Sequence, residues 1–202
     1  FKTISQCQKI DWKEIICNGE IKTVDVGLIR IHNKERYFLN MTGVGMSAQV
    51  IKVKNRLPKW IPTNLKYLFS TLKAFFEYKP EKVLIKTDSC EIETNLLGLF
   101  INKGKYAGGG MLFGSNAQLD DGLFDVTIME KSPICTMLRH LPKVYSGKFE
   151  KVPQIRKIKT KNIQVFSNSK ISVEIDGEFM GASDIEAKVL PEAIKIRSLK
   201  NG

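Results

Sequence analysis

The chain has 202 residues, 43% of them apolar, with 32 Lys and Arg against 21 Asp and Glu, which gives a formal net charge of +11 at pH 7. This length and apolar content are sufficient for one large buried core. The longest apolar stretch, around residues 96–101, is far too short to cross a bilayer, so we expect no membrane-spanning segment.

Cysteine and histidine usage argues against a zinc or redox centre. The four cysteines form no C-x-x-C pair, and only two histidines accompany them. A zinc site therefore lacks an adequate ligand set, and the reduced thiols of a cytoplasmic protein are expected.

The positive charge is spread along the chain and is densest between residues 151 and 161, which indicates an anionic partner. Nucleic acid would match this charge, but the run lacks interleaved aromatic residues, a recognition-helix pattern and zinc-ligand spacing, so we expect no nucleic acid. An anionic membrane surface matches equally well, at about 1 kcal/mol for each Lys or Arg held near it. Lysines on the wet face of a strand would give the same pattern.

The first expected elements are a short helix and two strands. Apolar residues among polar ones predict one or two short helices that end near residue 18. Alternation over 21–31 predicts a half-buried strand, in which Asp25 lies on the face opposite its apolar neighbours, where it could simply face water. A turn over 32–35 leads to a second strand over 37–42, followed by a glycine-rich exit.

The clearest helix is predicted over 63–78, with Thr63 as its N-cap and Pro80 as its stop. Six apolar side chains fall on one face at helical spacing, which favours packing on a core, although part of the stripe could instead line a lipid cleft. They are Leu65, Leu68, Phe69, Leu72, Phe75 and Phe76.

Short strands dominate the rest of the chain. A further helix is predicted to begin at Ser132 and Pro133. Many short strands with only two or three helices predict a mainly β fold, a two-sheet β-sandwich or distorted barrel with two or three helical insertions. A parallel doubly wound sheet is disfavoured, because strand does not alternate with helix. The remaining predicted strands cover 82–87, 95–102, 124–130, 154–166, 171–175 and 193–197. The apolar run of 95–102 predicts a central strand, and a bend within 154–166 is left open.

Two acidic turns are candidates for chemistry. The segment 117–125 places three carboxylates around Gly122 just before a strand, which suits either a hard cation with oxygen ligands or an ordinary Asp-Gly turn. The segment 171–178 alternates into a second Asp-Gly turn with Asp176 and Glu178 on either side of the glycine. That pattern fits a simple hairpin or a carboxylate that accepts a proton from a hydroxyl nucleophile.

Taken together, several segments resemble, in order and over nearly the whole chain, the bacterial diacylglycerol-kinase-like lipid kinases, relatives of the eukaryotic diacylglycerol, sphingosine and ceramide kinases. Each segment alone is weakly specific, and their number, order and spacing carry the resemblance. They are Thr23–Gly27, Tyr37–Gly45, Asn102–Met111, Leu119–Val126, Asp176–Glu178 and Val189–Ile194.

The resemblance implies a two-domain kinase on the diacylglycerol kinase/NAD kinase-like fold. Residues 1–202 would form its single C-terminal, β-rich domain, and an N-terminal α/β domain with a Gly-Gly-Asp-Gly-Thr phosphate loop would be absent from this chain. Phe1 resembles the Phe that follows an Asn-Asp pair in family members, so we expect the chain to be a piece that does not turn over alone.

The resemblance also implies roles for individual residues. Glu178 would be the general base, Asp176 would help to orient it, and Asp25 would belong to an acidic network between metal, base and phosphates. A structural Mg²⁺ would be held by the Asp121 carboxylate and the main-chain oxygens of two further residues, Gln118 and Leu123. The family usually has Pro where Ser115 stands, which affects the rigidity of that loop but not its ligands.

The implied reaction transfers the γ-phosphoryl group of ATP, with Mg²⁺, to the free hydroxyl of a lipid. Diacylglycerol, phosphatidylglycerol, a sphingoid base and an undecaprenol-like alcohol all remain open as substrates, and a homodimer is left open. We expect a cytoplasmic protein that is peripheral at an anionic membrane. The alternative is a non-catalytic basic β module that binds anionic membrane or nucleic acid, and phosphorylation of NAD or polyphosphate is less favoured.

Overall fold

The structure is a computed structural model of the chain, and it describes residues 12–107, 110–133, 135, 136, 139, 140, 143 and 152–198. Within these residues the strands form one eleven-stranded sheet in which all pairs are antiparallel. The elements are α1 (Trp12–Asn18), β1 (Glu20–Ile31), β2 (Lys34–Phe38), β3 (Met41–Gly45), α2 (Met46–Arg56), α3 (Thr63–Glu77), β4 (Glu81–Thr87), β5 (Glu91–Asn102), β6 (Phe124–Glu130), β7 (Ile155–Thr160), β8 (Asn162–Ser167), β9 (Ser172–Ile175), β10 (Glu178–Ala182) and β11 (Ile185–Ser198).

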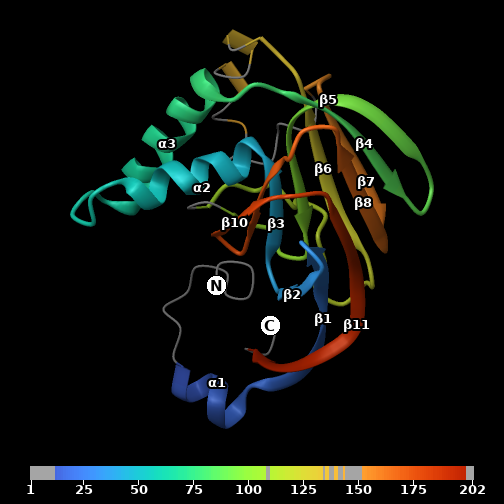
Figure 1. The fold of residues 1–202 in the computed structure, drawn as a ribbon. Helices are drawn as coiled ribbons and strands as arrows, with labels where there is room; N and C mark the ends of the chain where they lie inside the picture. Colours follow the sequence, from blue (N-terminus) through green and yellow to red (C-terminus); the bar gives the residue numbers. More distant parts are fainter. Residues whose placement is uncertain are drawn as a thin grey trace.

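Strand β5 joins two layers of this sheet. Its first half pairs with β4 from Glu91 to Leu96, and its second half pairs with both β3 and β6 as far as Asn102. One layer therefore runs β4-β8-β11-β1-β2, and the other runs β7-β6-β5-β3-β9-β10. Figure 1 shows the strongly curved sheet that results. The predicted mainly β fold with helical insertions is confirmed.

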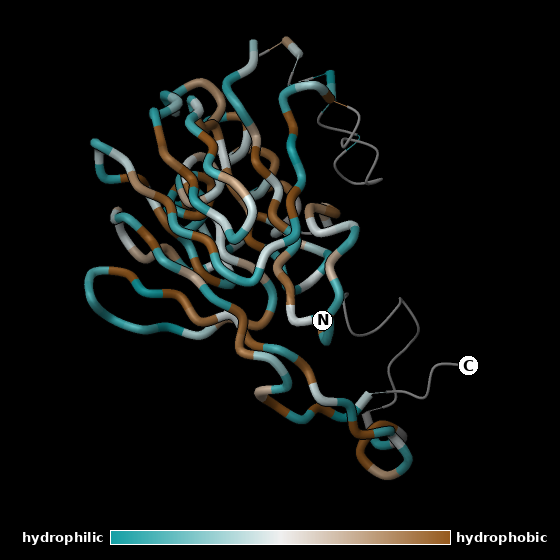
Figure 2. The backbone as a smooth tube through the Cα atoms, turned by 90° about the vertical axis from the view of Figure 1, so that its right-hand side faces the viewer, coloured by the Kyte–Doolittle hydropathy of each residue, from teal (hydrophilic) through white to brown (hydrophobic). Residues whose placement is uncertain are grey.

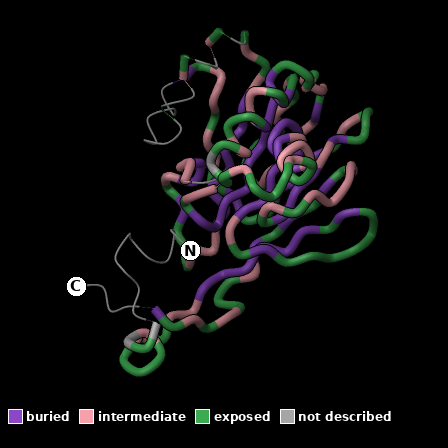
Figure 3. Tube along the Cα trace, turned by 90° about the vertical axis from the view of Figure 1, so that its left-hand side faces the viewer, coloured by how far each residue is buried: buried purple, intermediate pink, exposed green. Residues whose placement is uncertain are grey.

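The main core lies between the two layers. Ile29 and Ile85 come from one layer, Leu99 and Ile128 come from the other, and all four side chains are fully buried. The strands alternate between hydrophobic and hydrophilic residues along much of their length (Figure 2), as expected for half-buried strands. Burial is concentrated in the body of the sheet, whereas the end that carries α1 is mostly exposed (Figure 3).

Helices α2 and α3 pack on each other and cover the outer face of β5 and β3. Met46 and Val50 of α2 meet Phe75 of α3, and all three pack on Leu97 and Phe100 of β5 in a second apolar cluster. The second half of β5, from Leu96 to Asn102, is therefore buried on both faces, which explains its nearly continuous apolar run and confirms that it is central. No helix was predicted at α2, because lysines interrupt the short series of apolar residues in this segment.

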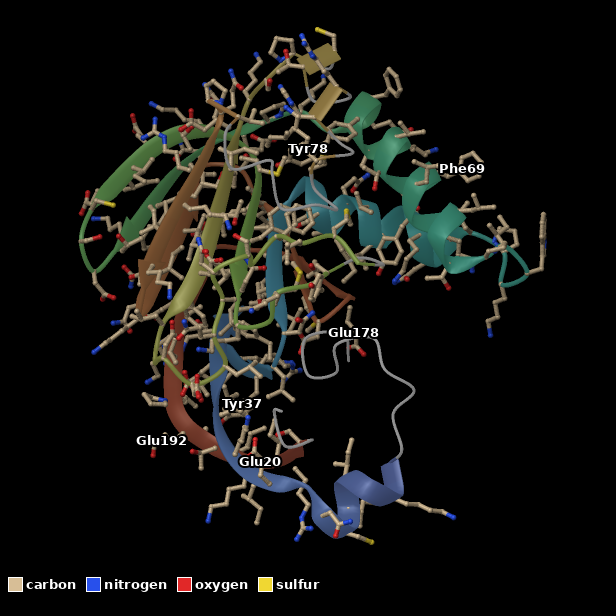
Figure 4. All side chains as sticks on the ribbon, turned by 180° about the vertical axis from the view of Figure 1, so that it is seen from behind. Glu20, Tyr37, Phe69, Tyr78, Glu178 and Glu192 are labelled. Atoms are coloured by element: carbon tan, nitrogen blue, oxygen red, sulfur yellow. The ribbon has the colours of Figure 1, made fainter. Side chains whose placement is uncertain are left out.

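The apolar stripe of α3 is only partly buried, in contrast to the expected core packing. Phe75 is buried, but Leu68, Phe69 and Phe76 are exposed by 44%, 56% and 70%. Figure 4 shows the Phe69 side chain pointing away from the sheet. Thr63 is the first helical residue rather than the N-cap, and the cap residue has no side-chain hydrogen bond to the helix. The helix therefore presents an apolar surface to its surroundings.

Two predicted strands are each divided, and for one of them, 154–166, a bend had been left open. The segment 37–42 contains the end of β2 and the start of β3, separated by a bend at residues 39 and 40. The segment 154–166 is divided between β7 and β8 at Lys161, where the Asp88 carboxylate accepts hydrogen bonds from the Lys161 N–H at 2.6 Å and the Thr160 hydroxyl at 2.7 Å. In both cases a distant carboxylate holds the bend, and local alternation cannot reveal it.

Helix α1 and the helix predicted from Ser132 differ in how far the described residues cover them. Strands β1 and β11 extend as a long ribbon toward α1 (Figure 1), and the Gly19 N–H closes that helix on the Ile15 carbonyl at 3.0 Å. The predicted helix from Ser132 falls largely outside the described residues, although residues 135, 136, 139, 140 and 143 are helical. Among the described helices, none is both long and apolar enough to cross a bilayer.

Candidate active site: two linked acidic turns

Asp25 lies at a break in the ladder between β1 and β11. The two strands pair regularly on both sides, but the three residues 191–193 of β11 lie opposite this single residue. Pro191 has no N–H to contribute to the ladder, and Glu192 adopts a φ of +51°. Such a bulge frees the opposite backbone, and the Asp25 N–H instead donates to the Leu119 carbonyl at 2.7 Å. The bulge thus attaches β1 to the loop that contains the first acidic turn.

The Asp25 side chain is buried, so the interpretation that it faces water is wrong. Its carboxylate accepts hydrogen bonds from the Lys103 ammonium at 2.7 Å, the Gly122 N–H at 2.8 Å and the Glu192 N–H at 3.0 Å. Burial alone would raise the pKa of Asp25, but these three hydrogen bonds outweigh burial and hold the pKa below its ordinary value. Asp25 is therefore ionised at neutral pH, and both of its carboxylate oxygens accept hydrogen bonds.

Lys103 is the residue at this site that the sequence analysis missed. Its side chain is fully buried, and its ammonium donates to Asp25, to the Asp121 carboxylate at 3.3 Å and to the Leu123 carbonyl at 3.0 Å. An ammonium has three N–H donors, so this set is complete. The second Asp121 oxygen accepts from Lys159 at 2.8 Å.

The pKa of Asp121 is also below its ordinary value. Burial would raise this pKa, but the hydrogen bonds from Lys159 and the Leu123 N–H and the charge of Lys103 outweigh it. Asp121 of the first acidic turn and Asp25 beside it are therefore ionised carboxylates whose charges are balanced by Lys103 and Lys159.

A divalent cation does not fit beside Lys103 in this arrangement. Two of the three predicted ligands, the Asp121 carboxylate and the Leu123 carbonyl, already accept from its ammonium, and the third residue, Gln118, is exposed and is not among the partners of that ammonium. Mg²⁺ binds oxygen at about 2.0–2.1 Å, so an ion on these oxygens would compete with Lys103 for the same space and meet its positive charge. Within the described residues, no three His, Cys, Asp or Glu side chains are grouped to hold a metal.

The second acidic turn is a two-residue hairpin between β9 and β10. Asp176 and Gly177 have φ values of +45° and +88°, as the tight turns of antiparallel hairpins require. The Asp176 carboxylate accepts hydrogen bonds from three consecutive backbone N–H groups, those of Leu39 at 2.9 Å, Asn40 at 3.1 Å and Met41 at 2.8 Å. Asp176 therefore fixes the hairpin to the bend between β2 and β3, which is the physical reason for that bend.

Glu174 is a second residue that the sequence analysis left without a role. It is buried, and its carboxylate accepts a hydrogen bond from the Gly177 N–H at 2.9 Å. Burial and the charge of Asp176 raise the pKa of Glu174 to about 7, although the Gly177 hydrogen bond and the charge of Lys54 oppose this rise. A Cβ at Gly43 would lie 2.6 Å from a Glu174 carboxylate oxygen, so only glycine leaves room for this buried acid.

Glu178 is the first residue of β10, directly after the turn, where it pairs with Ile175. Its side chain is exposed, and no hydrogen bond or ion pair engages it within the part of the chain that the structure describes. Figure 4 shows Glu178 projecting from the sheet on the side from which α1 and α3 extend. In contrast to the carboxylates of Asp25 and Asp176, the Glu178 carboxylate accepts no hydrogen bond from a described residue.

Asn40 links the two acidic turns. Its N–H donates to Asp176 of the hairpin, and its carbonyl accepts from the N–H groups of Lys103 and Gly104, both at 2.8 Å. Lys103 in turn contacts Asp25. The two turns, which are more than 50 residues apart in the sequence, therefore belong to one hydrogen-bonded unit.

A polar cavity of about 550 Å³ adjoins the first turn, and three lysines, Lys105, Lys157 and Lys159, line it with Asp125. Lys157 donates to the Ser115 hydroxyl and lies 3.6 Å from Asp125. Burial raises the pKa of Asp125 in spite of the nearby Lys157 charge. Part of the basic run predicted from sequence thus lines a cavity that suits an anionic group.

The geometry defines a class of protein, a curved antiparallel β-sandwich that holds an exposed carboxylate next to a network of buried carboxylates and lysines. The chain matches the model of the YegS C-terminal NAD kinase beta sandwich-like domain over residues 40–198. It therefore belongs to that family.

Individual relatives agree with this assignment. The chain is 26% identical over 192 residues to a diacylglycerol kinase of Mycobacterium tuberculosis, covering 94% of this chain and 61% of the relative. It is 26% identical over 189 residues to a YegS-like protein of Shewanella frigidimarina that is named as a lipid kinase candidate, covering 90% of this chain and 57% of the relative. This chain thus spans about three fifths of the length of these curated relatives.

Solved structures show the same fold. A crystal structure of a candidate diacylglycerol kinase from Bacillus anthracis superposes with a TM-score of 0.69 at 23% identity, covering 92% of this chain and 59% of that one. A second diacylglycerol kinase structure from that organism gives a TM-score of 0.61 at 17% identity.

Proposed function

We propose that this chain is the acceptor-side part of an ATP-dependent lipid kinase, in which Glu178 is the general base. The relatives named as diacylglycerol or lipid kinases support this class of reaction. The assignment of Glu178 rests on a difference in hydrogen bonding among three carboxylates. Those of Asp25 and Asp176 accept structural hydrogen bonds, whereas the exposed Glu178 carboxylate accepts none within the described residues.

The hairpin holds the backbone of Glu178 in place, although its side chain forms no hydrogen bond or ion pair within the described residues. The Asp176 carboxylate fixes the turn from one side through the amides of 39–41, and Glu174 fixes it from inside through the Gly177 N–H. A base on a rigid turn loses little orientational freedom when the acceptor hydroxyl arrives, which is the main contribution a protein makes to phosphoryl transfer. Asp176, Glu174 and Asp25 are accordingly positioning residues.

The proposed reaction is an in-line transfer with MgATP as the phosphoryl donor. The lipid hydroxyl oxygen attacks the γ-phosphorus, its proton passes to the Glu178 carboxylate, and the bond between the γ-phosphorus and the bridging oxygen breaks to release MgADP. The acceptor is a lipid with a free hydroxyl. The nucleotide would be bound largely by residues beyond this chain, since the chain spans only part of its kinase relatives.

The test is Glu178→Gln in the complete protein that carries this chain, assayed with labelled ATP and a panel of lipid alcohols. We expect turnover to fall by roughly 10²- to 10⁴-fold, the usual contribution of a general base, with an unchanged melting temperature. Glu93→Gln is the matched control, because Glu93 is an exposed strand glutamate on β5. Unaltered turnover in the Glu178 variant would remove Glu178 from the mechanism, whereas a complete protein that phosphorylates no lipid of the panel would favour a non-catalytic basic module.

We also propose that α3 docks the protein on an anionic membrane. Its exposed Leu68, Phe69 and Phe76, with Trp60 just before the helix, form an apolar surface, and Lys66 and Lys73 lie on the same helix. Apolar side chains beside lysines are the combination that holds a helix in the interface of an anionic bilayer. A kinase docked in this way would take its lipid from the membrane surface.

Sedimentation with vesicles of phosphatidylglycerol and phosphatidylcholine tests the docking proposal. The double variant Phe69→Ser, Phe76→Ser should lower the affinity for vesicles at least tenfold, because each exposed phenylalanine contributes about 1.5–3 kcal/mol when buried. Ile21→Ser is the control, since Ile21 is 60% exposed on β1, away from α3. Equal loss of binding in the control, or none in the double variant, would contradict the proposal.

A further inference from the structure

Lys103 occupies the position at which a divalent cation was expected from the resemblance. Its ammonium is within 3.3 Å of the Asp121 carboxylate and within 3.0 Å of the Leu123 carbonyl, two of the three expected metal ligands, and 2.7 Å from Asp25. All three donors of the ammonium are used by these oxygens. The loop therefore already contains a positive charge with a full set of oxygen partners.

The charge balance is the one that a divalent ion would give. Asp25 and Asp121 contribute two negative charges, and Lys103 and Lys159 contribute two positive charges at 2.7–3.3 Å from them. Buried carboxylates need such compensation, because an unpaired buried charge is strongly destabilising. No negative charge of this pair is left over for an added cation.

The backbone directs Lys103 into this position. Its N–H donates to the Asn40 carbonyl at 2.8 Å at the end of β5, and its side chain is 0% exposed. The fully buried stem rules out an ordinary surface ion pair, in which lysine keeps its ammonium in water.

We propose that Lys103 acts as a built-in replacement for a structural metal ion, so that the order of the 119–123 loop in this protein does not depend on a divalent cation. This inference is independent of the proposed kinase reaction, in which Mg²⁺ arrives with ATP. It predicts that removal of Lys103 turns a metal-independent loop into a metal-dependent one, because the oxygens would be left with space and unbalanced negative charge.

The experiment is thermal unfolding of the complete protein without nucleotide, in EDTA and in millimolar Mg²⁺ or Ca²⁺. The wild-type melting temperature should be the same in all three conditions. Lys103→Ala should lower it in EDTA by several degrees, as for a broken buried ion pair, and Mg²⁺ or Ca²⁺ should restore most of this loss in a concentration-dependent manner.

Two further variants locate the effect. Adding Asp121→Asn to Lys103→Ala should abolish the rescue by cations, and Lys82→Ala, at an exposed lysine paired with Glu93, should change neither the melting temperature nor its cation dependence. Isothermal titration with Ca²⁺ should show a site in Lys103→Ala that the wild-type protein lacks.

The wild-type measurement decides the matter even if Lys103→Ala does not fold. A wild-type melting temperature that falls in EDTA, recovers in Mg²⁺ and loses this dependence in Asp121→Asn would show a cation at the loop together with Lys103 and overturn the proposal. A folded Lys103→Ala variant that is as stable as wild type, or that is destabilised without gaining any cation dependence, would overturn it as well. None of these outcomes bears on Glu178, so the kinase proposal stands or falls separately.

Discussion

At the 119–123 loop, Asp121 and the adjacent Asp25 of β1 form ion pairs with lysines, and their pKa values are lowered. In the 174–178 hairpin the buried carboxylate of Glu174 forms no ion pair with any described residue, and its pKa is raised to about 7. The two turns share an Asp-Gly dipeptide and are joined through Asn40. Their difference shows that the same dipeptide can lie beside carboxylates with lowered pKa values or beside one with a raised pKa, depending on where the lysines lie.

The largest effect on stability is expected at the neutralised loop. Asp25→Asn keeps the shape of the side chain but leaves Lys103 with only one of its two carboxylates. We expect a loss of about 3–5 kcal/mol in the free energy of unfolding at pH 7, the usual cost of breaking a buried pair. Urea unfolding measures it, with Asp184→Asn as an exposed control. A loss below 1 kcal/mol would mean that the loop does not depend on this pair.

The next effect is expected at Glu174 and depends on pH. The unfolded chain releases the Glu174 proton near pH 4.5 and the folded chain near pH 7, so between these values the folded state holds more protons and its stability falls as pH rises. Glu174→Gln removes this penalty. The variant should match wild type near pH 4 and be more stable by up to about 3 kcal/mol at pH 8, at 1.36 kcal/mol per pKa unit. A difference that is constant across pH would contradict the raised pKa.

A smaller effect, but one that reaches the chemistry, is expected at Asp176. Asp176→Asn cannot accept all three backbone hydrogen bonds and should cost about 2 kcal/mol. Asp88→Asn is the matched control, because Asp88 holds the bend between β7 and β8 in the same way, away from Glu178. Both variants should be destabilised, but only Asp176→Asn should lower kcat of the folded complete protein. Equal kcat values would separate the hairpin from the reaction.

The smallest effect is expected at Lys159, whose side chain is 40% exposed beside Asp121. Exposed pairs contribute about 0–1 kcal/mol, so Lys159→Met should lower the free energy of unfolding by less than 1 kcal/mol, far less than Asp25→Asn. Chemical unfolding in low and high salt checks this, since the effect should shrink as salt rises. A loss as large as that of Asp25→Asn would mean that Lys159 carries the charge balance.

The sequence predicted the β-rich fold and the two acidic turns well, because strand alternation and Asp-Gly dipeptides are local signals. It did not predict the burial of Asp25, which depends on a bulge at 191–193 in a strand at the other end of the chain. It also missed Lys103, since a lysine between Asn and Gly has the pattern of an exposed turn. Only the packing of β5 against the 119–123 loop turns this side chain inward.

The helices show the same difference between local sequence signals and contacts made by distant parts of the chain. Phe75 and Phe76 have equal apolar character, but the first is buried and the second is 70% exposed. Periodicity gives the direction of a stripe around a helix and says nothing of how much partner surface the rest of the protein provides. Glu174 was likewise indistinguishable from a solvent-facing strand residue, since the space that Gly43 leaves for it comes from a neighbouring strand.

Strand β5 pairs with three other strands and its second half is covered on both faces, so it belongs to both layers of the sheet. Neither layer can open without disrupting the strand on which the other depends, and the two should therefore unfold as one cooperative unit. The amides of residues 98–102 should then exchange with solvent only through global unfolding. Asn40, which is bonded to the end of this strand through Lys103, would tie both acidic turns to the slowest-exchanging part of the protein.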